Sequence, residues 1–263
     1  MSKLPISAVI IVKNEEKKIR SCLSSLRDNV DEIIIVDDES VDATCQIAQK
    51  EFGAKVYNRA LNGDFAAQRN FGAAQARNDW ILALDADETV PGATFNKVAQ
   101  VINSDDADRI ELKRLNHLID IPLYNPGASI WEKSKLYRKS VTGFSGFIHE
   151  ELLEKGKLVR ADACIHHFPL PSLGAMFEKM HRYTDIEAEH YVESGIVTLR
   201  EIKYNLTVKP LKIFWKLYFK KKGYKDGTAG LVMSIMNTLG PVVYWLKIWE
   251  RNYFKIKDEK QSG

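Results

Sequence analysis

Two hydrophobic spacings alternate along the first third of the chain. Short runs of consecutive apolar, mostly β-branched residues indicate buried parallel strands, and between them apolar residues recur three and four apart, as on one face of a helix. The predicted strands cover residues 6–12, 32–36, 55–58 and 79–84, and the predicted helices cover 19–26, 42–52 and 65–77. This rhythm predicts a doubly wound α/β fold, a mostly parallel central sheet with flanking helices that binds ligands at the carboxyl ends of its strands.

The pattern becomes irregular after a further predicted helix at 98–103. The later segments are strands at 109–115 and 134–138, two polar-studded stretches at 144–151 and 163–168, and helices from about residue 172 to the end. We therefore expect three parts, which are an α/β half over 1–115, a second half of the same domain over 116–171, and a helical extension over 172–263.

Composition limits the class of protein. The 263 residues are 45% hydrophobic and 28% charged, which excludes a disordered chain and a small disulfide-stapled domain. Cys22, Cys45 and Cys164 have no CxxC spacing, so we expect free thiols in a reducing compartment and no zinc cluster built on thiolates. The first residues lack the pattern of a signal peptide, so we expect a cytoplasmic protein.

Asp85 and Asp87 stand directly after the predicted strand 79–84. Two carboxylates separated by one residue on such a turn can share a hard divalent cation and leave coordination positions open for phosphate oxygens. The pattern therefore predicts a Mg²⁺ or Mn²⁺ site at this edge of the sheet. The simpler alternative is a solvated acidic turn.

A second acidic pair, Asp37 and Asp38, ends the strand 32–36 and should converge on the same edge. A bound cation would relieve the repulsion between the two pairs, and Asp37 could accept hydrogen bonds from a nucleobase or a ribose. For Asp38 and Ser40 the alternative is capping of the following helix, and Asn14 is a plausible cap of the first helix.

Phosphate binding has to rely on a metal and on side chains. None of the 15 glycines belongs to a GxGxxG or GxxxxGK motif, so neither a dinucleotide fingerprint nor a Walker loop is present. Arg69, on the helix before the Asp85 strand, is the natural cation for this edge. It could instead pair with Asp64 or Asp79.

Four motifs occur in the order and spacing of family 2 glycosyltransferases, which have the GT-A fold. The motifs are Val9–Glu16 (VIIVKNEE), Glu32–Thr44 (EIIIVDDESVDAT), Ala67–Gly72 (AQRNFG) and Leu84–Glu88 (LDADE). The chain resembles this family over residues 6–90, and the resemblance implies a Rossmann-like GT-A domain. The residues it implies for nucleotide contact are Asn14, Glu15, Asp37, Asp38, Arg69, Asp85 and Ala86. It also implies that Asp85 and Asp87 form the DxD motif, which meets the metal and the diphosphate.

The second half carries a shorter similarity. Ser145–Glu151 (SGFIHEE), followed by His166, is similar to the branch of the family that includes bacterial lipopolysaccharide core glucosyltransferases. This implies that Glu150 is the base that takes the acceptor hydroxyl proton, with His149 beside it. The alternative is a surface His and Glu pair in an acidic loop. A zinc-protease motif is excluded because Leu153 stands where a second histidine would be needed.

The pair His166 and His167 offers a possible third metal ligand. Of the two we expect His166 to be the ligand, so that the metal would bind Asp85, Asp87 and His166. The alternative is a hydrogen-bonded core role for both, because hard cations prefer oxygen.

The C-terminal region is basic and aromatic. Residues 200–263 contain 14 Lys and Arg against 5 Asp and Glu, whereas the rest of the chain has an excess of acidic residues. Lys212, Lys216 and Lys220 form one stripe of a predicted helix, and the opposite side carries Leu211, Phe214, Trp215 and Tyr218. Separate charged and apolar faces favour an anionic membrane surface over nucleic acid, where rings and charges would share a face.

Residues 227–246 carry no charge and are long enough to span a bilayer. Pro241 should break a spanning helix in its second half. The sequence leaves three alternatives: one spanning helix, an interfacial or re-entrant pair, and a helix buried against the catalytic domain.

These observations predict an inverting, metal-dependent glycosyltransferase at the inner face of the cytoplasmic membrane. The expected donor is a nucleoside-diphosphate sugar, UDP-glucose first, and the expected acceptor is a membrane-anchored glycan such as the lipopolysaccharide inner core. One alternative is a haloacid-dehalogenase-like phosphohydrolase, because Asp85–Thr89 (DADET) also fits a DxDxT strand with Asp85 as nucleophile. Another is a membrane-tethering module with a degenerate site.

Overall fold

The computed structural model describes residues 3–125, 129–146, 150–169, 172–193, 195 and 197–261, with the side chains of 129–134 and 256–261 left out. The chain forms two compact units. The sheet unit comprises residues 1–115 and 130–167, and the helical unit comprises 116–129 and 168–263. This division differs from the expected three parts chiefly after residue 115, where the described residues 116–125 and 129 group with the helices.

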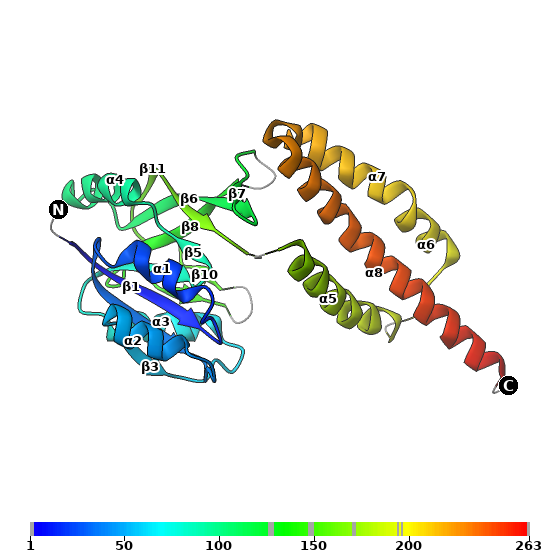
Figure 1. Cartoon of the computed structure of the whole chain (residues 1–263), viewed down its shortest axis with the longest axis horizontal. Helices are drawn as coiled ribbons and strands as arrows, with labels where there is room; N and C mark the ends of the chain where they lie inside the picture. Colours follow the sequence, from blue (N-terminus) through cyan, green and yellow to red (C-terminus); the bar gives the residue numbers. More distant parts are fainter. Residues whose placement is uncertain are drawn as a thin grey trace. The chain divides into compact units, whose positions relative to one another are not determined.

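A central sheet organises the sheet unit (Figure 1). Its first strands and helices alternate as β1 (Leu4–Val12), α1 (Ile19–Leu26), β2 (Val30–Asp37), α2 (Thr44–Phe52), β3 (Lys55–Asn58), α3 (Phe65–Gln75) and β4 (Trp80–Asp85). The later elements are β5 (Glu88–Thr89), α4 (Gly92–Asn103), β6 (Arg109–Leu118), β7 (Ile121–Pro122), β8 (Ser129–Arg138), β9 (Phe144–Ser145), β10 (Glu151–Leu152) and β11 (Leu158–His167).

The sheet order confirms the predicted α/β fold of the GT-A type. The order is β3-β2-β1-β4-β8-β6-β11-β5, with β7 paired to β6. Strands β1 to β4 are mutually parallel, whereas β8 runs antiparallel to β4 and β11 antiparallel to β5. Strands β9 and β10 form a separate antiparallel pair.

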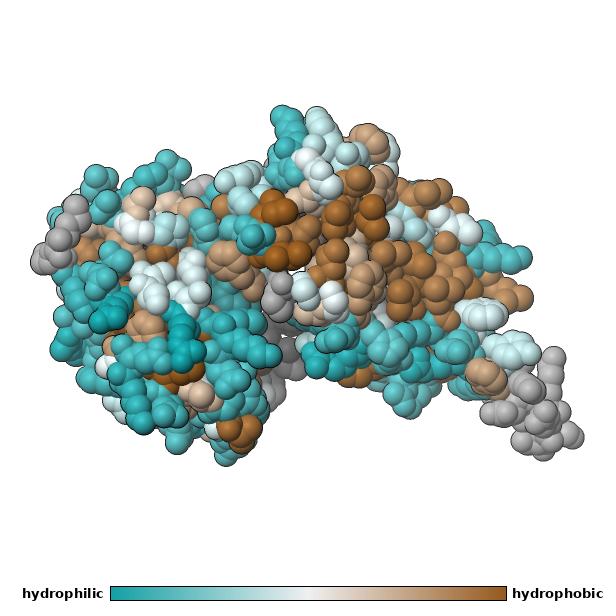
Figure 2. All heavy atoms as spheres, in the orientation of Figure 1, coloured by the Kyte–Doolittle hydropathy of each residue, from teal (hydrophilic) through white to brown (hydrophobic). Residues whose placement is uncertain are grey.

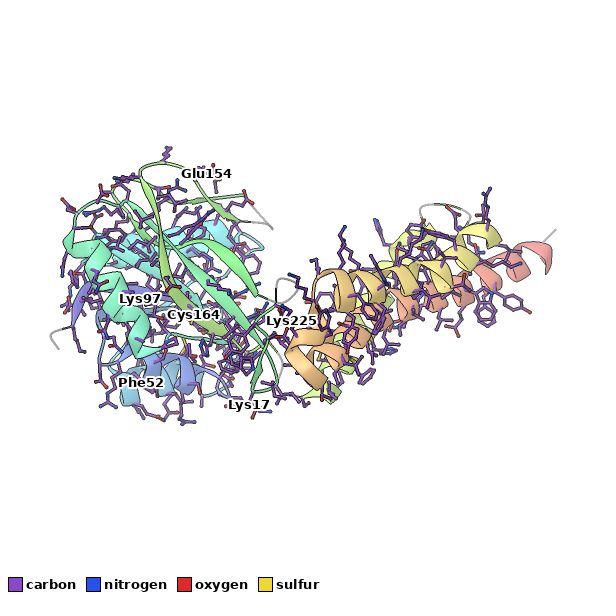
Figure 3. The ribbon with its side chains drawn as sticks, turned by 90° about the horizontal axis from the view of Figure 1, so that it is seen from above. Lys17, Phe52, Lys97, Glu154, Cys164 and Lys225 are labelled. Atoms are coloured by element: carbon purple, nitrogen blue, oxygen red, sulfur yellow. The ribbon has the colours of Figure 1, made fainter. Side chains whose placement is uncertain are left out.

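Helices cover both faces of the parallel strands, which explains their uninterrupted apolar runs. One apolar cluster joins the sheet to α1, α2 and α4, and a second joins the opposite face to α3. On the first face α4 packs along β11, where Lys97 and Cys164 are labelled in Figure 3. On the second face Gly72 lets α3 approach the sheet, because an added Cβ would lie 2.4 Å from Val9 Cγ1. The close approach places Arg69 at the sheet edge.

The helical unit confirms the predicted C-terminal extension. Its elements are α5 (Leu173–Glu193), α6 (Leu199–Leu206), α7 (Val208–Trp215), a π-helical turn η1 (Lys216–Lys220), a 3₁₀ helix η2 (Gly223–Asp226) and α8 (Gly227–Gln261). Helix α8 packs against α5, α6 and α7. The prediction that Pro241 breaks this region was wrong, because α8 continues through it. Packing on several neighbouring helices outweighs the loss of one backbone hydrogen bond.

Candidate active site

Two loops at the carboxyl ends of β1 and β2 are joined by hydrogen bonds. The Asn14 backbone N–H donates to Ser40 Oγ over 2.8 Å, and Asn14 Oδ1 accepts from the Val41 N–H over 2.8 Å. The Glu15 N–H donates to Thr44 Oγ1, also over 2.8 Å. The side chains of this cluster therefore hold the two loops together as one rim of the site.

The helix-capping alternatives for this rim were wrong. Helices α1 and α2 begin after Lys18 and Ala43, and neither has a side-chain cap. Asn14 and Ser40 instead bond across to each other's loops. The backbone of Asn14 has a φ of +55°, a conformation that asparagine tolerates better than most residues.

Asp37 and Asp38 have different roles in this rim. Asp38 accepts from Lys13 Nζ over 2.9 Å and from the Leu61 N–H over 2.8 Å, and these two bonds hold the pKa of its carboxyl below the usual range. Asp37 is 2% exposed, and its Oδ2 accepts from the Ser40 N–H. Its Oδ1 is buried without a hydrogen-bond partner among the described residues. Asp38 thus links neighbouring loops by hydrogen bonds, whereas Asp37 retains one carboxylate oxygen that accepts no hydrogen bond from the described residues.

Strand register places Asp37 and Asp85 at the same edge of the sheet. Val12 of β1 pairs with Asp37 on one side, and Ile11 pairs with Asp85 on the other. Two strand spacings separate the two aspartates, which is about 10 Å. The two acidic clusters therefore flank the end of β1, as the sequence predicted.

Asp85 lies between two cations of the protein. Arg69 Nη2 donates to its Oδ1 over 2.7 Å, and Lys135 Nζ donates to its Oδ2 over 3.0 Å. Burial opposes the charge on Asp85, but the ammonium of Lys135 and the guanidinium of Arg69 outweigh it and hold its pKa well below the usual range. Asp85 is therefore a fixed carboxylate, and the alternatives that paired Arg69 with Asp64 or Asp79 were wrong.

Glu88 forms the buried end of this network. Its side chain is fully buried, and its Oε2 lies 2.5 Å from Lys135 Nζ and accepts from the Asp85 N–H over 3.0 Å. Burial raises the pKa of Glu88 in spite of the neighbouring ammonium. Glu88 thus fixes both the backbone of Asp85 and the lysine beside it.

Arg69 also reaches Glu150. Its Nε donates to Glu150 Oε1 over 3.1 Å, so that one guanidinium bridges the predicted DxD aspartate and the predicted base. The adjacent Asn70 exchanges two hydrogen bonds with the backbone of Phe144, of 2.8 and 2.9 Å, and so anchors β9 to α3. His149 lies outside the described residues.

Asp87 has different neighbours from Asp85. One of its oxygens lies 3.6 Å from His167 Nε2 and 3.9 Å from Lys18 Nζ. His167 therefore approaches Asp87, and the expectation that His166 binds the metal stays a prediction. Ala86, between the two aspartates, is buried.

The expected metal ligands are not assembled into one centre. Within the part of the chain that the structure describes, no three His, Cys, Asp or Glu side chains are grouped closely enough to hold a metal. Asp87 is 21% exposed, and Asp85 is 37% exposed. Two partly exposed carboxylates on one turn fit a hard cation whose remaining ligands come from a bound phosphate.

Sequence reasoning missed Lys135, Glu88 and Asn70. Lys135 precedes a leucine in a predicted strand, and such alternation of polar and apolar residues normally indicates an exposed lysine, although Lys135 is buried here. Glu88 follows two aspartates and was indistinguishable from an exposed acidic turn. Asn70 acts on the backbone of Phe144, 74 residues away, and no local pattern reveals such a contact.

Comparisons with known proteins agree with this geometry. Residues 7–167 match the family model of glycosyl transferase family 2. The lipopolysaccharide core biosynthesis glycosyltransferase LpsC of Rhizobium meliloti is 27% identical over 97% of this chain and 96% of its own length. An uncharacterized glycosyltransferase of Rickettsia conorii, RC0292, is 27% identical over 88% of this chain and 85% of its own length.

A solved structure shares the fold. S. aureus TarS 1–349, crystallised in complex with UDP-GlcNAc, aligns with a TM-score of 0.50 and 15% identity over 98% of this chain and 92% of the other. These similarities give no support to the phosphohydrolase alternative.

Proposed function

The chain belongs to glycosyl transferase family 2, and on this basis we propose an inverting enzyme that moves glucose from UDP-glucose to a hydroxyl of a membrane-anchored glycan such as the lipopolysaccharide inner core. The observation that carries the proposal is the Arg69 bridge, which places Asp85 and Glu150 around one guanidinium. The similarity to LpsC supports the acceptor class, and the UDP-GlcNAc bound to TarS supports a UDP donor.

The proposed reaction is a single displacement. Glu150 removes the acceptor proton, the acceptor oxygen attacks the anomeric carbon, and the bond from that carbon to the diphosphate breaks. Arg69 stabilises the negative charge that develops on the diphosphate, and its buried Nη1 has no hydrogen-bond partner among the described residues. Asp37 would accept a hydrogen bond from the base or the ribose.

Asp85 and Asp87 would hold a divalent cation. When bound, that cation would supply Lewis-acid stabilisation of the leaving diphosphate. The two carboxylates stand on the turn after β4, next to Arg69 and His167.

Donor binding gives the direct test of this function. A ligand at one hundred times its Kd stabilises the folded state by about 2.7 kcal/mol, so UDP-glucose with Mn²⁺ should raise the Tm by several degrees. Thermal-shift measurements with UDP-glucose, other UDP-sugars and an aryl phosphate, each with and without Mn²⁺, check this. No shift with any UDP-sugar would contradict the proposal and favour a tethering module with a degenerate site.

An exposed apolar surface of the helical unit would suit a lipid-anchored acceptor. Helix α7 and η1 expose an apolar stripe of Leu211, Trp215 and Phe219, at 72, 58 and 51% exposure. Each residue of this stripe is followed directly by a lysine, so a second stripe of Lys212, Lys216 and Lys220 runs beside it. Figure 2 shows apolar residues gathered over α7 and α8.

Helix α8 adds to this surface. Within the described residues, one helical stretch, 223–255, which joins η2 to most of α8, is long and apolar enough to cross a membrane. Only 28% of its most apolar 18-residue segment is buried. Exposed rings beside lysines suit the headgroup region of an anionic bilayer, so we infer peripheral attachment to the inner face of the cytoplasmic membrane.

Replacing Lys212, Lys216 and Lys220 by glutamine should weaken vesicle binding. Each lysine near an anionic surface contributes about 1 kcal/mol, so the triple change should lower the partition coefficient about 100-fold. Co-sedimentation with vesicles containing phosphatidylglycerol measures it, and the exposed Lys17, Lys50 and Lys155 of the sheet unit, changed in the same way, form the control. Equal losses in both variants would contradict a specific surface.

A further inference from the structure

Lys135 is a buried cation at the candidate metal site that the proposed reaction does not use. Its side chain is 10% exposed and projects from β8, whose neighbouring residue Leu136 pairs with Leu82 of β4. The ammonium lies 3.0 Å from Asp85 Oδ2 and 2.5 Å from Glu88 Oε2. It therefore sits directly against the carboxylate that ends β4.

A buried ion pair such as Lys135 and Glu88 is not in itself evidence of a contribution to stability. Replacement of a buried ion pair by apolar residues of similar volume is often neutral or stabilising, because desolvation cancels the attraction between the charges. One oxygen of Glu88, Oε1, is also buried without a partner in the described part of the chain. An incompletely satisfied pair of this kind points to a role in the site more than to a role in stability.

Arg69 and Lys135 each donate to a different carboxylate oxygen of Asp85. Arg69 takes Oδ1 and Lys135 takes Oδ2, so that each carboxylate oxygen already accepts a charged hydrogen bond. A divalent ion that approaches Asp85 meets both positive charges and competes with Lys135 for Oδ2. The donor diphosphate, in contrast, brings negative charge that offsets this repulsion.

We propose that Lys135 is a positioning residue that lowers the affinity of the free enzyme for a divalent cation and so couples metal binding to donor binding. The proposal rests on the metal use proposed above. Lys135 holds Asp85 in place while the site is without donor, and the diphosphate restores the charge balance that allows the metal to bind. Coupling of this kind is reciprocal, so the metal also tightens donor binding.

Mn²⁺ binding to the full chain tests the proposal, because the direction in which the Kd for Mn²⁺ changes when Lys135 is removed separates the alternatives. Free Mn²⁺, measured by electron paramagnetic resonance, gives the Kd with and without UDP for wild type, Lys135→Met and the control Lys157→Met. Lys157 is an exposed lysine paired with Asp106, so the control removes the same charge from the surface. Loss of the buried cation should tighten Mn²⁺ binding without UDP about tenfold or more and reduce the effect of UDP, while the control stays like wild type.

Each other outcome overturns the proposal. A merely structural role for Lys135 would weaken Mn²⁺ binding in Lys135→Met or leave it unchanged. If that variant does not fold, Lys135→Gln, which removes the charge but keeps a hydrogen-bond donor for Asp85 and Glu88, is measured in its place, with the same expected tightening. Absence of Mn²⁺ binding in wild type and in all variants would overturn both this inference and the proposed metal use. Donor binding in the thermal-shift assay would in that case still support the proposed transferase.

Discussion

Glu150→Gln is expected to lower kcat for sugar transfer by about 10²–10⁴-fold, the contribution of a positioned general base. Glutamine has the size of glutamate, and its side-chain oxygen can still accept from Arg69 Nε, as Glu150 Oε1 does over 3.1 Å. The variant therefore keeps the local structure and loses only the group that takes the proton. The measurement is initial-rate transfer from UDP-glucose to a lipid-linked glycan.

The control for this variant is Glu151→Gln, which removes the next carboxylate along the chain. Glu151 is exposed on β10, so its loss should leave kcat within about twofold, as surface substitutions usually do. Calorimetry should give the same Kd for UDP in wild type and in Glu150→Gln. Unimpaired turnover in Glu150→Gln with intact UDP binding would remove Glu150 from the role of base.

The fold was predictable because its signals are local. The apolar runs of the parallel strands and the helical spacing between them depend on which nearby positions are buried. Both can therefore be recognised in the sequence without knowing which elements pack together. Pro241 shows the limit of such reasoning. Its effect on α8 depends on how α8 packs against α5, α6 and α7, and the conformational preference of proline alone does not predict that packing.

The site was predictable only in part, for a related reason. Strand ends and the family motifs located Asp37, Asp85 and Arg69 at one edge of the sheet. Which side chains meet there depends on register across the sheet, and this register brings His167 to Asp87. Lys135 reaches Asp85 from a strand 50 residues later in the chain, a contact that no spacing indicates.

Arg69→Met is expected to lower kcat by about 10²–10³-fold, the usual loss when one donor that stabilises transition-state charge is removed. Burial would lower the pKa of this guanidinium, but Asp85 and Glu150 raise it, so Arg69 is a permanent cation of the site. Its removal also leaves two partly buried acceptors without a donor, at a cost of about 1–3 kcal/mol in the free energy of unfolding. Urea denaturation measures the second effect.

Arg69→Lys separates charge from geometry. An ammonium keeps the positive charge but lacks the planar fork that lets Nε meet Glu150 while Nη2 meets Asp85. We therefore expect most of the stability to return in Arg69→Lys while kcat stays low. The control is Arg77→Met, which removes an exposed arginine paired with Asp31 and should change stability by no more than about 1 kcal/mol. Recovery of full turnover by Arg69→Lys would mean that Arg69 contributes charge alone, and that its bridge between the two carboxylates does not order the reacting groups.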